Sequence, residues 1–189
     1  LSRLLYASEN YLWAIVVNNQ LQENDKNFWV DWPEQLLVFF PRPFVNSYKS
    51  IATKQKLPEA LLYSISRQES AFNSQAVSPA NAYGLMQLII PTAERMTARM
   101  NYKTNNIKQT LLKPTENIKF GGEYLNQLGE RYENVGPLVY SAYNAGEGAV
   151  DNWLERRAIK DRLSWIEAIP YGETRGYVKN VARNMAIYT

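Results

Sequence analysis

The apolar residues of this chain recur at helical spacing along most of its length. From residue 45 onward they return every three or four positions. The clearest examples are Val45, Tyr48 and Ile51, followed by Leu57, Leu61, Leu62 and Ile65. Such spacing places apolar side chains on one face of a helix, whereas a half-buried strand would alternate apolar and polar residues. Strand alternation is nearly absent, so the pattern predicts an all-α fold.

Helix boundaries follow from the Pro, Gly and Asn residues that punctuate this pattern. Pro58 suits a first helical turn, where its missing N–H would be unpaired anyway, so we expect a helix over 58–70. The pair Gly121–Gly122 would let another helix approach its own helix closely. The remaining expected helices span 91–99, 115–133, 136–143, 148–156, 163–168 and 173–188.

The N-terminal region is separated from the rest by the corner Pro41-Arg42-Pro43, which cannot lie inside a helix. We therefore expect residues 1–44 to be a short helical appendage, or the tail of an upstream helical or linker domain, and residues 45–189 to form the main domain. The chain begins at Leu1 without a signal-type segment, which is typical of a mature form or an excised domain. Its longest apolar runs are far shorter than the roughly 20 residues of a membrane helix.

The sequence contains no His and no Cys. Ser-His-Asp and Cys-His catalysis, zinc sites built on imidazole or thiolate, and disulfides are therefore excluded. A net charge of +3 suits an acidic polymer but is too small for a nucleic-acid-binding protein, and no dense Lys/Arg stripe is present. Chemistry would have to use carboxylates, Tyr, Lys, Arg, Ser, Thr or backbone dipoles.

Glu69 continues the apolar stripe of its helix, because Leu62, Ile65 and Glu69 point nearly the same way at 100° per residue. A Glu at a helix end usually reaches water. A carboxyl group half-buried beside apolar side chains instead has a raised pKa. At its reference pKa of about 4.3 a Glu is protonated only roughly once in 500 at pH 7, so a raised pKa would make Glu69 a candidate general acid for glycosidic bond cleavage.

Three separated segments accompany Glu69: Ser78-Pro79-Ala80-Asn81-Ala82-Tyr83-Gly84-Leu85-Met86-Gln87, Ser141-Ala142-Tyr143-Asn144-Ala145-Gly146, and Ile169 to Val178 with Glu173-Thr174-Arg175. Together with Glu69 they resemble the catalytic domain of the soluble lytic murein transglycosylases over about residues 45–189. The resemblance implies a goose-type lysozyme-like helical domain with a substrate groove. It places the chain in the periplasm or at the bacterial cell wall.

By this resemblance Glu69 is the sole catalytic acid and then the base, cleaving the bond between N-acetylmuramic acid (MurNAc) and N-acetylglucosamine (GlcNAc) in peptidoglycan. The C6 hydroxyl of the muramic acid would attack its own anomeric carbon and leave a 1,6-anhydro end. No cofactor or metal is implied. Peptidoglycan strands are the expected partner, with cell-wall or secretion complexes as further candidates.

The resemblance also implies substrate-binding roles for Ser78, Gln87, Ala142, Tyr143, Asn144 and Glu173. In the family, the hydroxyl corresponding to Tyr143 lies near the catalytic carboxyl. Three of these residues also have a structural alternative. Ser78 could cap a helix or form a turn, Tyr143 could be a core residue before an Asn-Ala-Gly helix stop, and Glu173 could form an ion pair or occupy a helix N-terminus. Tyr83, Tyr140 and Tyr177 could offer ring faces to sugars, although aromatic residues are more often in the core.

Two positions depart from the family pattern. Asn81 replaces the usual Gly, and Asn tolerates the left-handed conformation better than most residues. Ile89 replaces a Met, which puts an apolar contact with the substrate in doubt. Two other functions remain open: a goose-type lysozyme that uses water as the nucleophile, and a peptidoglycan-binding module without turnover.

Overall fold

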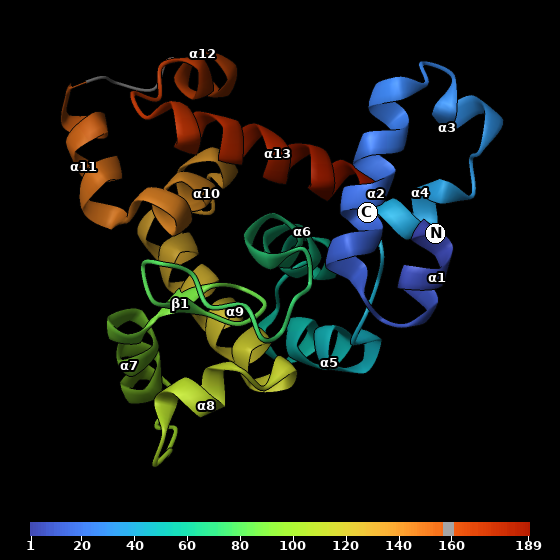
Figure 1. The fold of residues 1–189 in the computed structure, drawn as a ribbon. Helices are drawn as coiled ribbons and strands as arrows, with labels where there is room; N and C mark the ends of the chain where they lie inside the picture. The colour runs from blue at the N-terminus through green and yellow to red at the C-terminus, as the bar shows by residue number, and fades with distance from the viewer. Residues whose placement is uncertain (157–160) are drawn as a thin grey trace.

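The computed structural model describes residues 1–156 and 161–189, and the described residues form an almost wholly helical protein (Figure 1). This confirms the predicted all-α class. The N-terminal region contains α1 (Ser2–Ala7), α2 (Tyr11–Asn24), α3 (Phe28–Asp31) and α4 (Gln35–Phe39). The main region contains α5 (Val45–Gln55), α6 (Glu59–Ser70), α7 (Ile90–Arg99), α8 (Ile107–Leu111), α9 (Pro114–Arg131), α10 (Gly136–Ala145), α11 (Glu147–Arg156), α12 (Arg162–Glu167) and α13 (Gly172–Tyr188).

The helices predicted over 58–70 and beyond all exist, and their observed ends agree with the prediction to within two residues. The sequence pattern missed α8 and a small antiparallel hairpin, β1 (Ala82–Tyr83) and β2 (Leu88–Ile89), in which Ala82 pairs with Ile89. Strands this short cannot show an alternation. The hairpin is made by the turn between them, where Gly84 adopts a φ of +75°.

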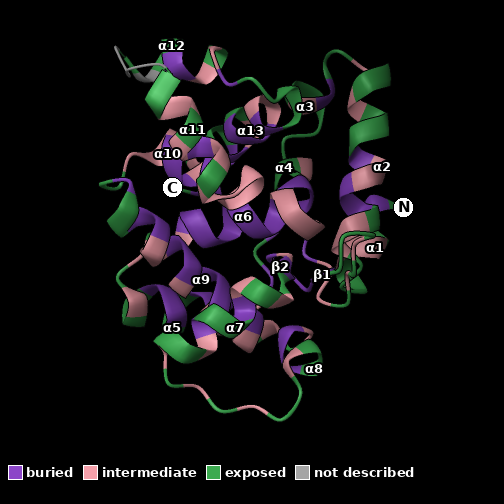
Figure 2. Cartoon of the chain, turned by 90° about the vertical axis from the view of Figure 1, so that its left-hand side faces the viewer, coloured by how far each residue is buried: buried purple, intermediate pink, exposed green. Residues whose placement is uncertain are grey.

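Helix α6 lies at the centre of the molecule and packs against α13, α5 and α9 (Figure 1). All of its residues from Ala60 to Arg67 are buried, and Figure 2 draws the helix largely in the colour of buried residues. Leu62 and Ile65 are fully buried. A helix that is enclosed on most sides can hold a polar group away from water at its end.

The glycines of helix α9 bring it close to the loop that follows α6 and to α5. A Cβ at Gly121 would lie 2.4 Å from the Met86 sulfur, and one at Gly122 would lie 2.0 Å from Gln55 Oε1 on α5. The expected close approach at this glycine pair is therefore confirmed. The fully buried Asn117 side chain accepts a hydrogen bond from the Met86 N–H at 2.7 Å and donates to the Tyr83 carbonyl at 2.9 Å, which fixes the loop onto α9.

The N-terminal helices share a hydrophobic core with the main region. Phe39 and Phe40 belong to the same buried cluster as Tyr63 and Tyr188. The Tyr188 hydroxyl, near the end of α13, donates to the Pro41 carbonyl at 3.1 Å. The division into an appendage of residues 1–44 and a domain of residues 45–189 stays a prediction, and the two parts are joined by continuous packing.

Candidate active site

A groove of about 850 Å³ crosses the main region. Its walls come from the end of α6, the loop and hairpin after it, α7, α9, the end of α10, the start of α11 and the first half of α13. Among the residues singled out from the sequence, this groove is lined by Glu69, Ser78, Gln87, Tyr143, Asn144 and Glu173. The fold thus brings together side chains that are up to 104 positions apart in the sequence.

Glu69 lies in the last turn of α6, on the stripe that Leu62 and Ile65 begin. The helix ends directly after it, because Ala71 and Phe72 adopt left-handed conformations with φ values of 47° and 66°. The carboxyl group is half-buried and faces the groove. The Tyr177 hydroxyl on α13 donates a hydrogen bond of 2.6 Å to its Oε1.

The surroundings of Glu69 raise its pKa from an ordinary value of 4.5 to about 7. Burial is the main cause, because the charged form loses hydration. The hydrogen bond from Tyr177 acts in the opposite direction by stabilising the carboxylate, and the negative charge of Glu173 raises the pKa further. A carboxyl group with a pKa near 7 is about half protonated at neutral pH, so it can donate a proton and accept one back.

Tyr177 is the principal residue that the sequence reasoning did not assign to the site. Its sequence context indicates only a ring face for sugars or a core residue. It is buried, and its hydroxyl is the phenol that contacts Glu69. The signal that would have identified it is its spacing: Tyr177 follows Glu173 by four positions, so on one helix both point to the same side.

Tyr143 lines the groove, and its hydroxyl donates to the Met86 carbonyl at 2.8 Å. Its pKa is raised well above the ordinary value by burial and then by the charge of Glu69. The ring also lies 5.2 Å from that of Tyr124. Tyr143 therefore fixes the loop that carries Gln87, and its expected contact with substrate stays a prediction.

Gln87 is held in a left-handed conformation with a φ of 48°. Its side-chain amide donates to the carbonyls of Gly84 at 2.8 Å and Ala76 at 3.2 Å. The side chain is thus oriented by the loop itself, while Leu85 is fully buried in the core. Ser78 accepts a hydrogen bond from the Ala82 N–H at 3.1 Å, so the turn that was its structural alternative is present beside its place in the groove.

The two departures from the family pattern have clear positions. Asn81 adopts a φ of 57°, which is the left-handed conformation expected for a residue in place of Gly. Ile89 lines the groove with 43% of its surface exposed, so it presents apolar surface there. Asn81 thus keeps the left-handed conformation, and the groove presents a β-branched side chain where the family usually has a Met.

Asn144 and Ala142 lie on α10 but differ in their surroundings. The Asn144 side-chain oxygen accepts a hydrogen bond of 2.7 Å from the Thr174 hydroxyl, which ties α10 to the first turn of α13 beside Glu173. Ala142 is fully buried and does not line the groove, because its side of the helix faces the core. The prediction that Ala142 contacts the sugar is not supported by this position. Glu173 itself is exposed at the groove.

One further cluster in the groove was not found from the sequence. Arg95 forms a salt bridge of 3.2 Å with Glu147, and the Gln127 amide donates to the same carboxylate at 2.9 Å. Glu147 is therefore paired with a cation, whereas the partner of the Glu69 carboxyl group is the Tyr177 hydroxyl. Among the described residues no cluster of His, Cys, Asp or Glu has the arrangement of a metal site, and no described helix is long and apolar enough to cross a membrane.

Comparison with known proteins agrees with this geometry. Residues 46–166 match the sequence model of the transglycosylase SLT domain, and residues 168–189 match that of the soluble lytic transglycosylase helical domain. A soluble lytic murein transglycosylase of Escherichia coli K12 is 33% identical over 97% of this chain and 27% of its own length. A putative one of Haemophilus influenzae is 38% identical over 78% of this chain and 25% of its own length. The chain thus spans about a quarter of the length of these curated relatives.

Two solved structures have the same fold. One is an inactive mutant of the lytic transglycosylase Slt of Pseudomonas aeruginosa in which a glutamate is replaced by glutamine. It has a TM-score of 0.89 and 34% identity and covers 99% of this chain and 29% of its own. The other is the 70 kDa soluble lytic transglycosylase of Escherichia coli, with a TM-score of 0.86, 31% identity, and coverage of 100% of this chain and 29% of its own. The chain belongs to the soluble lytic transglycosylase family and contains its SLT domain.

Proposed function

We propose that this chain cleaves peptidoglycan strands without water, at the β-1,4 bond between MurNAc and GlcNAc, and leaves 1,6-anhydro-MurNAc ends. The observation that carries the proposal is the half-buried Glu69, whose pKa is raised to about 7 beside an open groove. The names of the relatives, which are lytic murein transglycosylases, support the substrate. Such a substrate also supports a periplasmic location.

The reaction uses Glu69 twice, because this carboxyl group first donates a proton and later accepts one. Protonated Glu69 gives its proton to the glycosidic oxygen, and the bond from that oxygen to the anomeric carbon breaks with its electrons leaving on the oxygen. The anomeric carbon becomes oxocarbenium-like, and the 2-acetamido group of the same sugar stabilises it. The C6 hydroxyl then attacks this carbon and returns its proton to Glu69, which restores the enzyme.

A single carboxylate is sufficient for this route, whereas most glycosidases need two. The other acidic groups of the groove fit supporting roles. Glu147 forms an ion pair with Arg95. Glu173 is exposed in the first turn of α13, and its negative charge raises the pKa of Glu69. Tyr177 supplies the hydrogen bond that stabilises the carboxylate formed after proton donation.

Mass spectrometry of digested peptidoglycan tests the proposal. We expect anhydro-muropeptides as the products of the wild-type protein. Products heavier by one water would instead identify a goose-type lysozyme, and binding to peptidoglycan sacculi without any cleavage would identify a binding module.

A further inference from the structure

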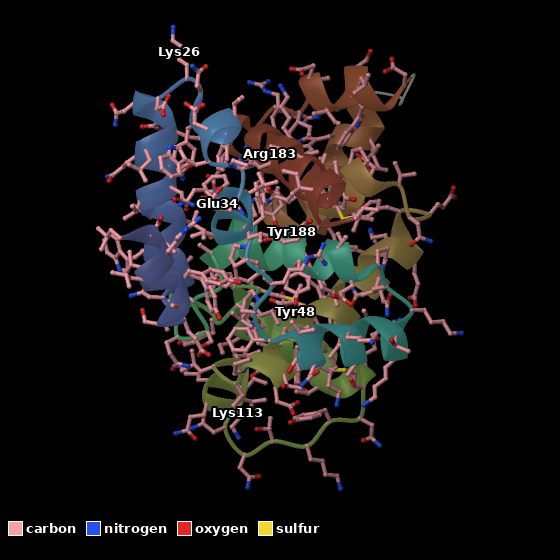
Figure 3. All side chains as sticks on the ribbon, turned by 90° about the vertical axis from the view of Figure 1, so that its right-hand side faces the viewer. Lys26, Glu34, Tyr48, Lys113, Arg183 and Tyr188 are labelled. Atoms are coloured by element: carbon pink, nitrogen blue, oxygen red, sulfur yellow. The ribbon has the colours of Figure 1, made fainter. Side chains whose placement is uncertain are left out.

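The groove that contains Glu69 also holds a cation that the proposed reaction does not use. Arg95 of α7 is the one basic side chain among the described residues that line the groove. Other basic residues, such as Lys26, Lys113 and Arg183, are exposed elsewhere on the molecule and are labelled in Figure 3, and none of these three lines the groove. A guanidinium group that faces a substrate groove is a candidate for a contact that orients the substrate.

Two contacts hold Arg95 in place. Its Nη2 lies 3.2 Å from Oε1 and 3.4 Å from Oε2 of Glu147, the first residue of α11. Its guanidinium also lies over the ring of the buried Tyr124, with 5.4 Å between Cζ and the ring centre. Figure 1 shows α7 and α11 on the same side of the molecule. The ion pair therefore joins two walls of the groove.

Glu147 is a fixed partner, because α9 and the residue after it hold it as well. The Gln127 amide donates to Oε1 at 2.9 Å, and the Glu147 carbonyl accepts a hydrogen bond of 3.2 Å from the Tyr132 hydroxyl. Only 21% of the Glu147 side chain is exposed. Its negative charge therefore stays beside Arg95 and offsets the positive charge there.

Arg95 keeps donors that can reach a ligand in the groove. A guanidinium carries five N–H donors, and the hydrogen bond of Arg95 to a described residue starts from Nη2. The Arg95 side chain is 45% exposed. Because Glu147 offsets the charge, the remaining donors suit uncharged oxygen acceptors, such as the hydroxyl and acetamido oxygens of a sugar, more than they suit an anion.

Arg95 lies away from the acid. Burial and then the charge of Glu69 raise the pKa of Tyr143, which places that tyrosine near the acid. The Tyr143 ring lies 5.2 Å from that of Tyr124, and Arg95 lies over Tyr124. A sugar at Arg95 would therefore be a neighbour, in the strand, of the sugars that react. Binding energy from such a remote part of the substrate can hold the reacting sugars in place.

We propose that Arg95 is a substrate-binding residue that donates hydrogen bonds to an uncharged sugar of the strand, and that Glu147 orients it and offsets its charge. This inference rests on the proposed function, because it takes a peptidoglycan strand as the occupant of the groove. The contact depends on the sugar itself and not on a peptide branch.

Equilibrium binding of an uncharged β-1,4-linked oligomer of GlcNAc to the Glu69→Gln protein tests this proposal. Adding Arg95→Gln should weaken binding about fivefold, equivalent to about 1 kcal/mol. The loss should be similar at about 0.1 M and about 1 M salt, because salt does not screen hydrogen bonds to an uncharged sugar. Adding Glu147→Gln should weaken binding less, by about twofold, because Arg95 keeps its donors.

Arg99→Gln is the matched control. Arg99 lies one helical turn after Arg95 on α7, pairs with Glu123 and Glu130, and does not line the groove. Its substitution removes a charge and two ion pairs from the same helix, and binding of the oligomer should stay unchanged. Arg95→Gln binding that equals that of the parent, losses of equal size in Arg95→Gln and Glu147→Gln, or a loss in Arg95→Gln that disappears in high salt would overturn the proposal.

Cleavage of peptidoglycan by the wild-type protein separates this inference from the proposed function. Anhydro products, together with an Arg95→Gln variant that binds the oligomer normally, would contradict the sugar contact alone. A fivefold loss of affinity in Arg95→Gln without cleavage by the wild type would contradict the proposed function and leave the sugar contact standing. An oligomer that fails to bind the Glu69→Gln protein at all would contradict the sugar contact.

Discussion

The hydroxyl of Tyr177 lies 2.6 Å from Oε1 of Glu69 and joins α13 to the last turn of α6 across 108 positions of sequence. This contact opposes the effect of burial, because it stabilises the charged carboxylate while the lost hydration favours the neutral acid. The balance leaves the pKa at about 7. A carboxyl group in that state can serve as acid and then as base within one reaction.

Tyr177→Phe should shift the alkaline limb of the pH profile of kcat/KM to higher pH. Glu69 must be protonated to act, so activity falls as pH rises through its pKa of about 7. Loss of the hydrogen bond removes a contact that lowers this pKa, so the pKa rises. Tyr140→Phe is the control, because Tyr140 is half-buried and does not line the groove. A limb that stays in place or moves to lower pH in Tyr177→Phe would contradict the assignment.

Glu69→Gln should reduce turnover by about 10²- to 10⁴-fold while preserving the fold. The amide has nearly the same volume and can still accept the hydrogen bond from Tyr177, but it has no acidic proton to donate. Turnover is measured on purified strands, with circular dichroism as the check on the fold. Retention of a substantial fraction of wild-type turnover would show that another group is the acid.

The same substitution should stabilise the protein in a pH-dependent way. In the unfolded chain Glu69 has its ordinary pKa of 4.5, and in the folded protein its pKa is about 7. Between these values the folded state holds the extra proton, so the wild type loses stability as pH rises through this window. The loss is on the order of 3 kcal/mol, because each pKa unit corresponds to about 1.4 kcal/mol.

Urea unfolding of the wild type and of Glu69→Gln measures this effect. Gln does not titrate, so the difference in unfolding free energy between the two proteins should grow in favour of Glu69→Gln from about pH 4.5 to about pH 7. A difference that stays constant over this range would mean that the folded protein does not raise the pKa of Glu69.

Gly84→Ala should destabilise the protein by about 2 kcal/mol or more. Gly84 has a φ of +75°, and a Cβ there would lie 2.2 Å from the Leu111 carbonyl oxygen. The matched control is Gly148→Ala in α11, where a Cβ would meet nothing within 4 Å. Thermal or urea unfolding compares the two variants. Equal losses of stability would contradict the role assigned to the turn.

The sequence was sufficient for most of the helices, although not for α8, and for the place of Glu69 on the buried stripe of its helix, because both depend on local periodicity. The stripe of Leu62, Ile65 and Glu69 is a property of one helix, and the structure keeps it. The short hairpin was not predictable, since two-residue strands exist only through the turn at Gly84 and the support of Asn117. Local pattern carries no information on such contacts.

Contacts between helices that are distant in the sequence were also not predictable from it. Tyr177 reaches Glu69 only because α13 packs against α6. Arg67 and Arg183 share a cavity because the N-terminal helices cover that side of α6. Ala142 shows the converse: its motif implied a place in the sugar-binding wall, while the structure buries its side chain in the core, and its role stays a prediction.

The most direct measurement is an NMR titration of the carboxyl carbon of Glu69 in the folded protein, assigned by the loss of its signal in Glu69→Gln. We predict a midpoint at about pH 7, caused by burial and moderated by Tyr177. A midpoint near the ordinary value of 4.5 would show a carboxylate that is fully charged at neutral pH and would contradict its role as the acid.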